Sequence, residues 1–151
     1  MKTTLHLKIF LITAISFLFA GTQAWADDDR PVSLGQLPQK AQSFIAEHFP
    51  HNEIALAKQE GYLFGKSYDV IFTNGDKLEF NRSGEWTKVK CRNNSIPGGI
   101  IPPKIAEYIN KHYPGLTVTD IEKEDWHYEV GLSNGIDLKF NNSFKLTDID
   151  L

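Results

Sequence analysis

The feature that most constrains the fold is the stretch 68–81, which returns in similar form as residues 128–141. Both copies alternate apolar and polar residues, break at an Asn-Gly pair and then alternate again. Asn-Gly between two alternating runs indicates a β-hairpin with a type I′ turn, which needs positive φ at both central residues. Alternation places the apolar side chains on one face of the sheet. The sequence therefore predicts two antiparallel hairpins, each with one buried face.

The similarity extends upstream, where residues 37–50 match residues 101–114. Both segments carry apolar residues at helical spacing, begin near a proline and end just before another, which predicts helices over 38–48 and 102–112. The first copy also holds an insertion near residues 61–66. We therefore expect an α+β fold built as a tandem repeat of two helix-plus-antiparallel-sheet units.

The two expected repeats span residues 37–91 and 101–150. A stretch rich in Asn, Ser, Pro and Gly, residues 92–100, is typical of a linker loop between them. A chain of this size buries about two-thirds of its unfolded surface, which is enough for one stable domain. We expect a single domain over residues 37–151.

The N-terminus indicates export. Residues 1–26 combine two early lysines, an apolar run at 9–20 and an A-x-A sequence at 24–26, the pattern of a cleaved secretory signal peptide. An uncleaved membrane anchor is the alternative, although the apolar run is short for a membrane span. Residues 27–36 are polar and lack periodicity, so we expect a flexible lead. The expected location is periplasmic or secreted, soluble and free of the membrane after cleavage.

The insertion is the most unusual local feature. Tyr62, Leu63 and Phe64 lie between glycines at an expected hairpin tip, where polar residues are the norm. One interpretation is a tip that folds back over the core. The other is an exposed anchor that enters a pocket of a partner protein.

Four further residues are candidate partner-binding residues. Strict alternation through strand 85–91 would point Trp86 and Lys88 outward, whereas a bulge would instead bury Trp86. Trp126 and His127 lie at the tip of the second hairpin, where a solvated turn is the alternative interpretation.

The sequence contains no nucleophile motif, Gly-rich phosphate loop, H-E-x-x-H or C-x-x-C pattern, so we expect no enzyme activity and no cofactor. The carboxylates Glu122, Glu124 and Asp125 read as solvated strand ends without calcium-loop spacing, so no metal site is expected. A lone cysteine, Cys91, excludes an internal disulfide. The net charge of −3 argues against a nucleic-acid partner.

The pattern L-P-x-x-A/I, H-F/Y-P and Y-x-V-x-F/L-x-N-G-x-x-L-x-F-N, found twice behind a signal peptide, resembles the PepSY-like periplasmic proteins common in Bacteroidetes. The resemblance covers residues 37–150. It implies a fold similar to that of β-lactamase inhibitor protein, with a concave sheet able to hold a protein or peptide. It does not imply β-lactamase inhibition, because that step would rest on fold analogy alone.

These observations lead to one main functional hypothesis and one alternative. The main hypothesis is a periplasmic, non-enzymatic module that binds or inhibits a protein or peptide through its open sheet face and the 61–66 tip. The alternative is a periplasmic sensor of a small molecule or of calcium. The oligomeric state and the identity of the partner stay open.

Overall fold

A computed structural model describes residues 29–61 and 65–151, so the expected signal peptide lies outside the described residues. The helical elements are η1, a short 3₁₀ turn (Leu34–Gln36), α1 (Gln39–His48) and α2 (Pro103–His112). The strands are β1 (Arg30–Pro31), β2 (Ile54–Glu60), β3 (Ser67–Phe72), β4 (Lys77–Phe80), β5 (Trp86–Lys90), β6 (Val118–Lys123), β7 (His127–Leu132), β8 (Asp137–Asn141) and β9 (Leu146–Asp150).

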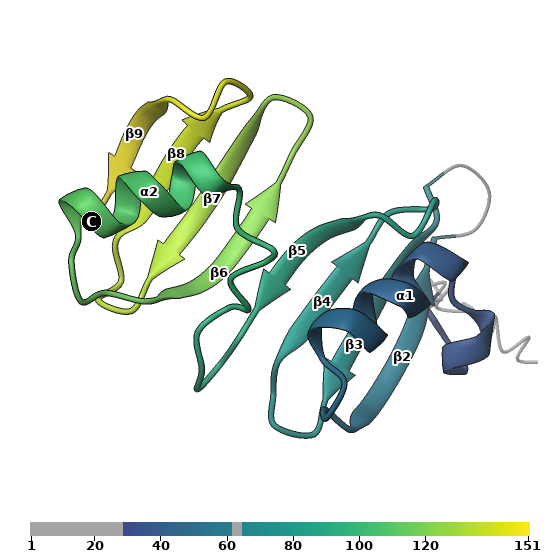
Figure 1. Ribbon diagram of the computed structural model, residues 1–151. Helices are drawn as coiled ribbons and strands as arrows, with labels where there is room; N and C mark the ends of the chain where they lie inside the picture. The colour runs from purple at the N-terminus through teal and green to yellow at the C-terminus, as the bar shows by residue number, and fades with distance from the viewer. Residues whose placement is uncertain (1–28, 62–64) are drawn as a thin grey trace, which may run out of the picture.

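Within the described part of the chain, nine strands form one antiparallel sheet in the order of the sequence, β1 to β9. Both helices lie on the same side of this sheet, α1 across β3 and β4 and α2 across β7 and β8 (Figure 1). The opposite side of the sheet has no helix over it among the described residues. The sheet thus has a covered face and an open face.

The covered face carries a continuous row of apolar residues, one from each of eight strands and each paired with the next across the sheet. The row consists of Ala57, Val70, Leu78, Val89, Ile121, Val130, Leu138 and Ile149. At its centre, Val89 of β5 pairs with Ile121 of β6, and both are fully buried. The core therefore does not stop between the two hairpins.

This pairing corrects the expected fold. The prediction of a tandem repeat of two helix-plus-antiparallel-sheet units is wrong, because β5 and β6 join all the strands of the described residues into one nine-stranded sheet with two helices. A boundary between units at residues 92–100 would leave Val89 and Ile121 at exposed sheet edges. Burying both side chains favours the continuous sheet.

The open face carries the complementary row, in which every member is charged. It consists of Lys58, Asp69, Glu79, Lys88, Glu122, Glu129, Lys139 and Asp148. Two neighbouring pairs in this row form ion pairs, Lys58 with Asp69 at 3.7 Å and Lys88 with Glu122 at 2.6 Å. Directly opposed unlike charges stabilise a sheet modestly, so the row helps to fix the strand register.

Besides its buried aliphatic side chains, each helix places one aromatic side chain against the sheet. Phe44 of α1 meets Phe80 edge-on at a ring-centroid distance of 5.7 Å, and Tyr108 of α2 meets Phe140 in the same way at 5.4 Å. The histidine in the last turn of each helix packs on that aromatic ring, at 4.7 and 4.3 Å respectively. Edge-to-face aromatic contacts of this kind add to the free energy gained from burial.

The hairpin turns differ from the expected type. Gly75 donates its backbone N–H to the carbonyl of Phe72, and Phe72 in turn donates to the carbonyl of Asp76. These bonds close a three-residue loop in which Gly75, at φ 88°, supplies the left-handed position. Gly135, at φ 85°, does the same in the second hairpin. The type I′ prediction is wrong because only the glycine, and not the asparagine, has positive φ.

The segment expected as a flexible lead takes part in the fold. Arg30 pairs with Gln59 of β2, and its guanidinium donates to the Gln59 side chain at 3.2 Å. The next residues form η1, closed by a capping box between Ser33 and Gln36. Arg30 and Pro31 therefore extend the sheet edge as β1, and η1 follows them. The local sequence did not predict this, because the strand pairs with a partner almost thirty positions away.

Candidate functional site

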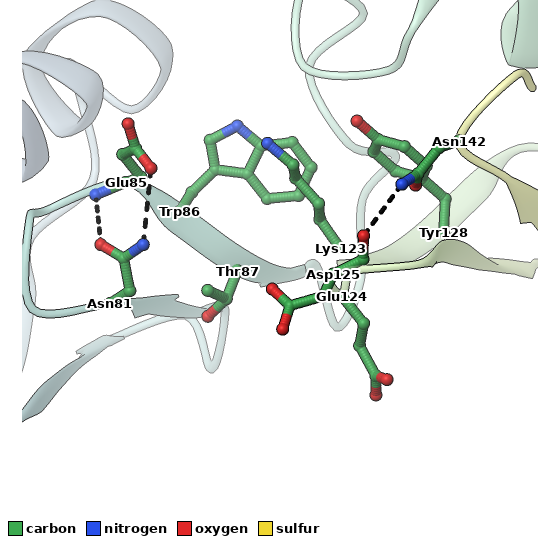
Figure 2. Close-up of a pocket in the computed structure, with 9 residues that line it drawn as sticks. All are labelled: Asn81, Glu85, Trp86, Thr87, Lys123, Glu124, Asp125, Tyr128 and Asn142. Carbon is green, nitrogen blue, oxygen red and sulfur yellow. Dashed lines mark hydrogen bonds between the residues drawn. The ribbon is translucent and has the colours of Figure 1, made fainter. Parts of the chain in front are cut away.

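A groove opens where β5 and β6 separate. The two strands are paired at three positions, the last of which joins Lys88 to Glu122, and residues 85–87 and 123–125 diverge beyond it. The groove has a volume of about 310 Å³ (Figure 2). Binding clefts for small ligands start at about 300 Å³, so the groove has room for a side chain or a small molecule.

The lining of this β5–β6 groove combines two aromatic rings, three carboxylates, one ammonium group and three uncharged polar side chains. The residues are Asn81, Glu85, Trp86, Thr87, Lys123, Glu124, Asp125, Tyr128 and Asn142 (Figure 2). They come from the β4–β5 turn, the start of β5, the end of β6, the β6–β7 turn, the start of β7 and the β8–β9 turn. Segments far apart in the sequence therefore build one site.

Trp86 reaches the groove because of a β-bulge. The register between β4 and β5 shifts so that Glu79 pairs with Lys88 while Phe80 pairs with Trp86. The indole consequently turns to the covered face, where it is half-buried and lies 6.4 Å from the ring of Phe44. The bulge interpretation is correct, and the interpretation from strict alternation is wrong. One side of the indole remains available to the groove.

Tyr128 forms the opposite wall and rests against a strained residue. Phe144, in the β8–β9 turn, has φ 60° and is the one non-glycine residue with positive φ among the described residues. Its ring lies 5.5 Å from that of Tyr128. The corresponding position in the β4–β5 turn is Gly84, which adopts φ 79° without steric cost. A bulky residue in the left-handed region costs free energy, and here its ring supports the groove wall.

The charges around the groove differ in how far they are neutralised. Glu85 accepts a hydrogen bond from Lys40 at 2.9 Å, which lowers the pKa of Glu85. The side chain of Asn142 donates a hydrogen bond to the backbone carbonyl of Asp125 at 2.9 Å. The Asp125 carboxylate itself forms no ion pair in the described part of the chain. Lys123 likewise has no carboxylate within ion-pair distance among the described residues.

The predicted partner-binding residues fall at different places. Trp126 is 75 % exposed in the turn next to the groove, and the ring of His127 lies 3.7 Å from Glu124. Lys88 points to the open face, where its hydrogen bond to Glu122 raises the pKa of Lys88. Trp86 and the Trp126 turn thus come together, whereas Lys88 does not line the groove.

Tyr62, Leu63 and Phe64 lie outside the described residues, so their role in binding a partner stays a prediction. Sequence reasoning missed Lys123 and Tyr128 as members of a site. The local pattern offered no signal for them, because each follows the regular alternation of its strand and becomes part of a groove only through the divergence of β5 and β6.

Neither a metal centre nor a reactive thiol emerges from the described residues. In residues 29–61 and 65–151, no group of three or more His, Cys, Asp or Glu side chains is placed to hold a metal ion. Cys91 is 3 % exposed, and burial, reinforced by the nearby Asp76 carboxylate, raises the pKa of its thiol to about 12. The thiolate needed for nucleophilic chemistry is therefore not formed near neutral pH.

Comparison with known proteins places the chain among periplasmic relatives. Residues 66–148 match the family model described as "Putative beta-lactamase-inhibitor-like, PepSY-like". A protein from Bacteroides vulgatus described as a "putative periplasmic protein from DUF2874 family" is 50 % identical, with a TM-score of 0.81, and the match covers 83 % of this chain and 99 % of that protein. A second protein from Bacteroides vulgatus, described as a "putative periplasmic protein of unknown function", is 34 % identical, with a TM-score of 0.77, and the match covers 82 % of this chain and 99 % of that protein.

A third similar structure, from Bacteroides thetaiotaomicron, is described as a "putative calcium-regulated periplasmic protein". It is 48 % identical, with a TM-score of 0.81, and the match covers 83 % of this chain and 99 % of that protein. No curated protein matches the chain. Among the described residues, no helix has the length and apolar character needed to cross a membrane. The predicted periplasmic location is confirmed by these relatives.

Proposed function

Because this chain belongs to the PepSY-like family of periplasmic proteins, we propose that it is an exported, non-enzymatic binding module for a protein or peptide partner. The observation that carries the proposal is Trp126, a residue that is 75 % exposed in the β6–β7 turn. Tryptophan is enriched among the residues that dominate binding energy at protein interfaces. Burying this side chain in a partner's pocket would contribute roughly 1.5–3 kcal/mol.

The open sheet face supports the same proposal. It presents a charged residue from each of the strands β2 to β9, with no helix over it among the described residues. Charges arranged in a fixed pattern select a partner and steer its approach more than they add affinity. A partner that rests on this face can reach Trp126 in the β6–β7 turn and His127 at the start of β7, which lets one surface supply both an apolar anchor and polar specificity.

The test is an affinity capture from an envelope extract of the source organism, followed by reconstitution with the purified partner. The exported chain is compared with its Trp126→Ala variant. We expect one protein to bind the unmodified chain directly and to bind the variant at least tenfold more weakly. The circular dichroism and the melting temperature of the Trp126→Ala variant should match those of the unmodified chain, which checks that the variant is folded. Equal binding by both chains would contradict the assignment of Trp126 as anchor.

A second candidate function is a sensor for a small ligand, which the β5–β6 groove favours because it pairs aromatic walls with convergent polar groups. The relative described as calcium-regulated makes calcium one ligand to include. The measurement is the melting temperature with and without calcium, haem and cell-wall fragments. A reproducible rise with one compound would support this candidate, and unchanged melting temperatures would remove it.

A further inference from the structure

The β5–β6 groove has a composition that selects one class of ligand group. Its aromatic walls, Trp86 and Tyr128, are each half-buried, and each is held from behind, Trp86 by Phe44 and Tyr128 by Phe144. Rings fixed in this way present their faces to a guest without losing further conformational freedom. The face of an aromatic ring is electron-rich and attracts cations rather than anions.

The charges of the lining point the same way. Three carboxylates and one ammonium group line the groove, so its formal charge is 1 − 3 = −2. Glu85 is already neutralised by Lys40 at 2.9 Å. Glu124 is 3.7 Å from the His127 ring, and the Asp125 carboxylate has no ion pair within the described part of the chain. With Glu85 neutralised, the two carboxylates of Glu124 and Asp125 outweigh the single ammonium group of Lys123, and the net negative charge of one favours an incoming cation.

We propose that the β5–β6 groove receives a lysine or arginine side chain from the partner, with arginine preferred. The proposal rests on the proposed function, since it names the chemistry of the segment that the module binds. The planar guanidinium group can stack on the indole of Trp86 and donate paired hydrogen bonds to the Asp125 carboxylate. A lysine ammonium offers the charge but lacks the flat surface. The amide oxygen of Asn142 provides a further acceptor at the rim, whereas that of Asn81 already accepts from the backbone N–H groups of Ser83 and Glu85.

The position of the groove suits a side chain better than a whole ligand. It lies between the start of β5 and the end of β6, next to the turn that carries Trp126, and has a volume of about 310 Å³. Trp86, Lys123 and Tyr128 extend to one side of the two strands, and Thr87 and Glu124 extend to the other (Figure 2). A partner segment that contacts Trp126 would pass the mouth of the groove. One basic residue on that segment can then enter while the rest of the segment stays on the surface.

The test uses two short peptides as probes, acetyl-Gly-Arg-Gly-amide and the same peptide with citrulline in place of arginine. Citrulline keeps the shape of arginine and removes its charge. Binding is followed by the NMR signal of the Trp86 indole N–H, which a Trp86→Phe variant identifies. We expect saturable binding of the arginine peptide, at least tenfold tighter than that of the citrulline peptide.

Two matched double variants separate the groove from general electrostatics. Glu124→Gln with Asp125→Asn should weaken binding of the arginine peptide about tenfold. Glu47→Gln with Glu107→Gln removes the same charge from the exposed surfaces of α1 and α2 and should change binding less than twofold. Equal binding of the citrulline peptide, equal effects of the two double variants, or no response of the Trp86 signal would each overturn the proposal.

The experiments can show the groove assignment to be wrong without contradicting the proposed protein-binding function, and the reverse. If the partner still requires Trp126 but binds the groove double variant unchanged, the module binds proteins and the groove assignment fails. If neither Trp126→Ala nor the groove double variant affects any partner while the arginine peptide still binds, the groove recognises a cation and the protein-binding proposal fails.

Discussion

Replacing Gly84 with alanine tests how closely the β4–β5 turn packs against α1. Gly84 has φ 79°, and a Cβ atom at this position would lie 2.6 Å from Cβ of Pro38 and 3.0 Å from the backbone nitrogen of Ala41. The left-handed conformation alone costs an alanine about 1–2 kcal/mol. Overlap with the first turn of α1 adds about 1–3 kcal/mol, because the backbone there cannot move aside freely.

Gly135→Ala supplies the matched control. Gly135 has φ 85° in the β7–β8 turn, which has the same hydrogen-bond pattern as the turn at Gly84, but a Cβ atom at Gly135 would have nothing within 4 Å. We therefore expect Gly84→Ala to lower the free energy of unfolding by about 2–5 kcal/mol, against about 1–2 kcal/mol for Gly135→Ala. The assay is equilibrium unfolding in urea, followed by tryptophan fluorescence. Equal losses from the two substitutions would refute the close packing of the turn against α1.

Three further predictions concern the pKa of Cys91, one ion pair and one close backbone approach. Because the Cys91 pKa is raised from 9.0 to about 12, the unfolded chain loses this proton first as the pH rises. Stability should therefore fall above pH 9, by up to about 1.4 kcal/mol per pH unit, and urea unfolding of Cys91→Ala should lack this contribution. A double-mutant cycle with Lys88→Gln and Glu122→Gln should give a coupling of about 0.5–1 kcal/mol that shrinks in 1 M salt, and zero coupling at low salt would contradict the ion pair. Gly131→Ala would place Cβ 2.2 Å from Oδ2 of Asp120, so it should cost about 1–3 kcal/mol, and less than half of that in an Asp120→Ala background.

The parts of the fold that the sequence predicted are those set by local signals. The helices begin and end within one residue of the expected bounds, because a proline and an apolar stripe mark each one. The hairpins follow from alternation around Gly75 and Gly135. The turn type was missed because Asn-Gly fits a three-residue loop as well as a type I′ turn, and the choice depends on the strand register rather than on the pair itself.

The joining of β5 to β6 depends on contacts that no local pattern reveals. A linker separates the two strands, so the repeat in the sequence suggested two units. One signal was present, since Lys88 and Lys90 on β5 oppose Glu122 and Asp120 on β6. The groove could not be predicted either, because it exists only where these paired strands diverge.

The measurement that tests the central claim most directly is photocrosslinking in living cells. A photoreactive amino acid replaces Trp126 in one version of the chain and Glu107, on the exposed surface of α2, in another. The account predicts one discrete crosslinked protein from position 126 and none from position 107. Identical products from the two positions, or no crosslinked protein from position 126, would contradict the claim that this end of the sheet binds a protein partner.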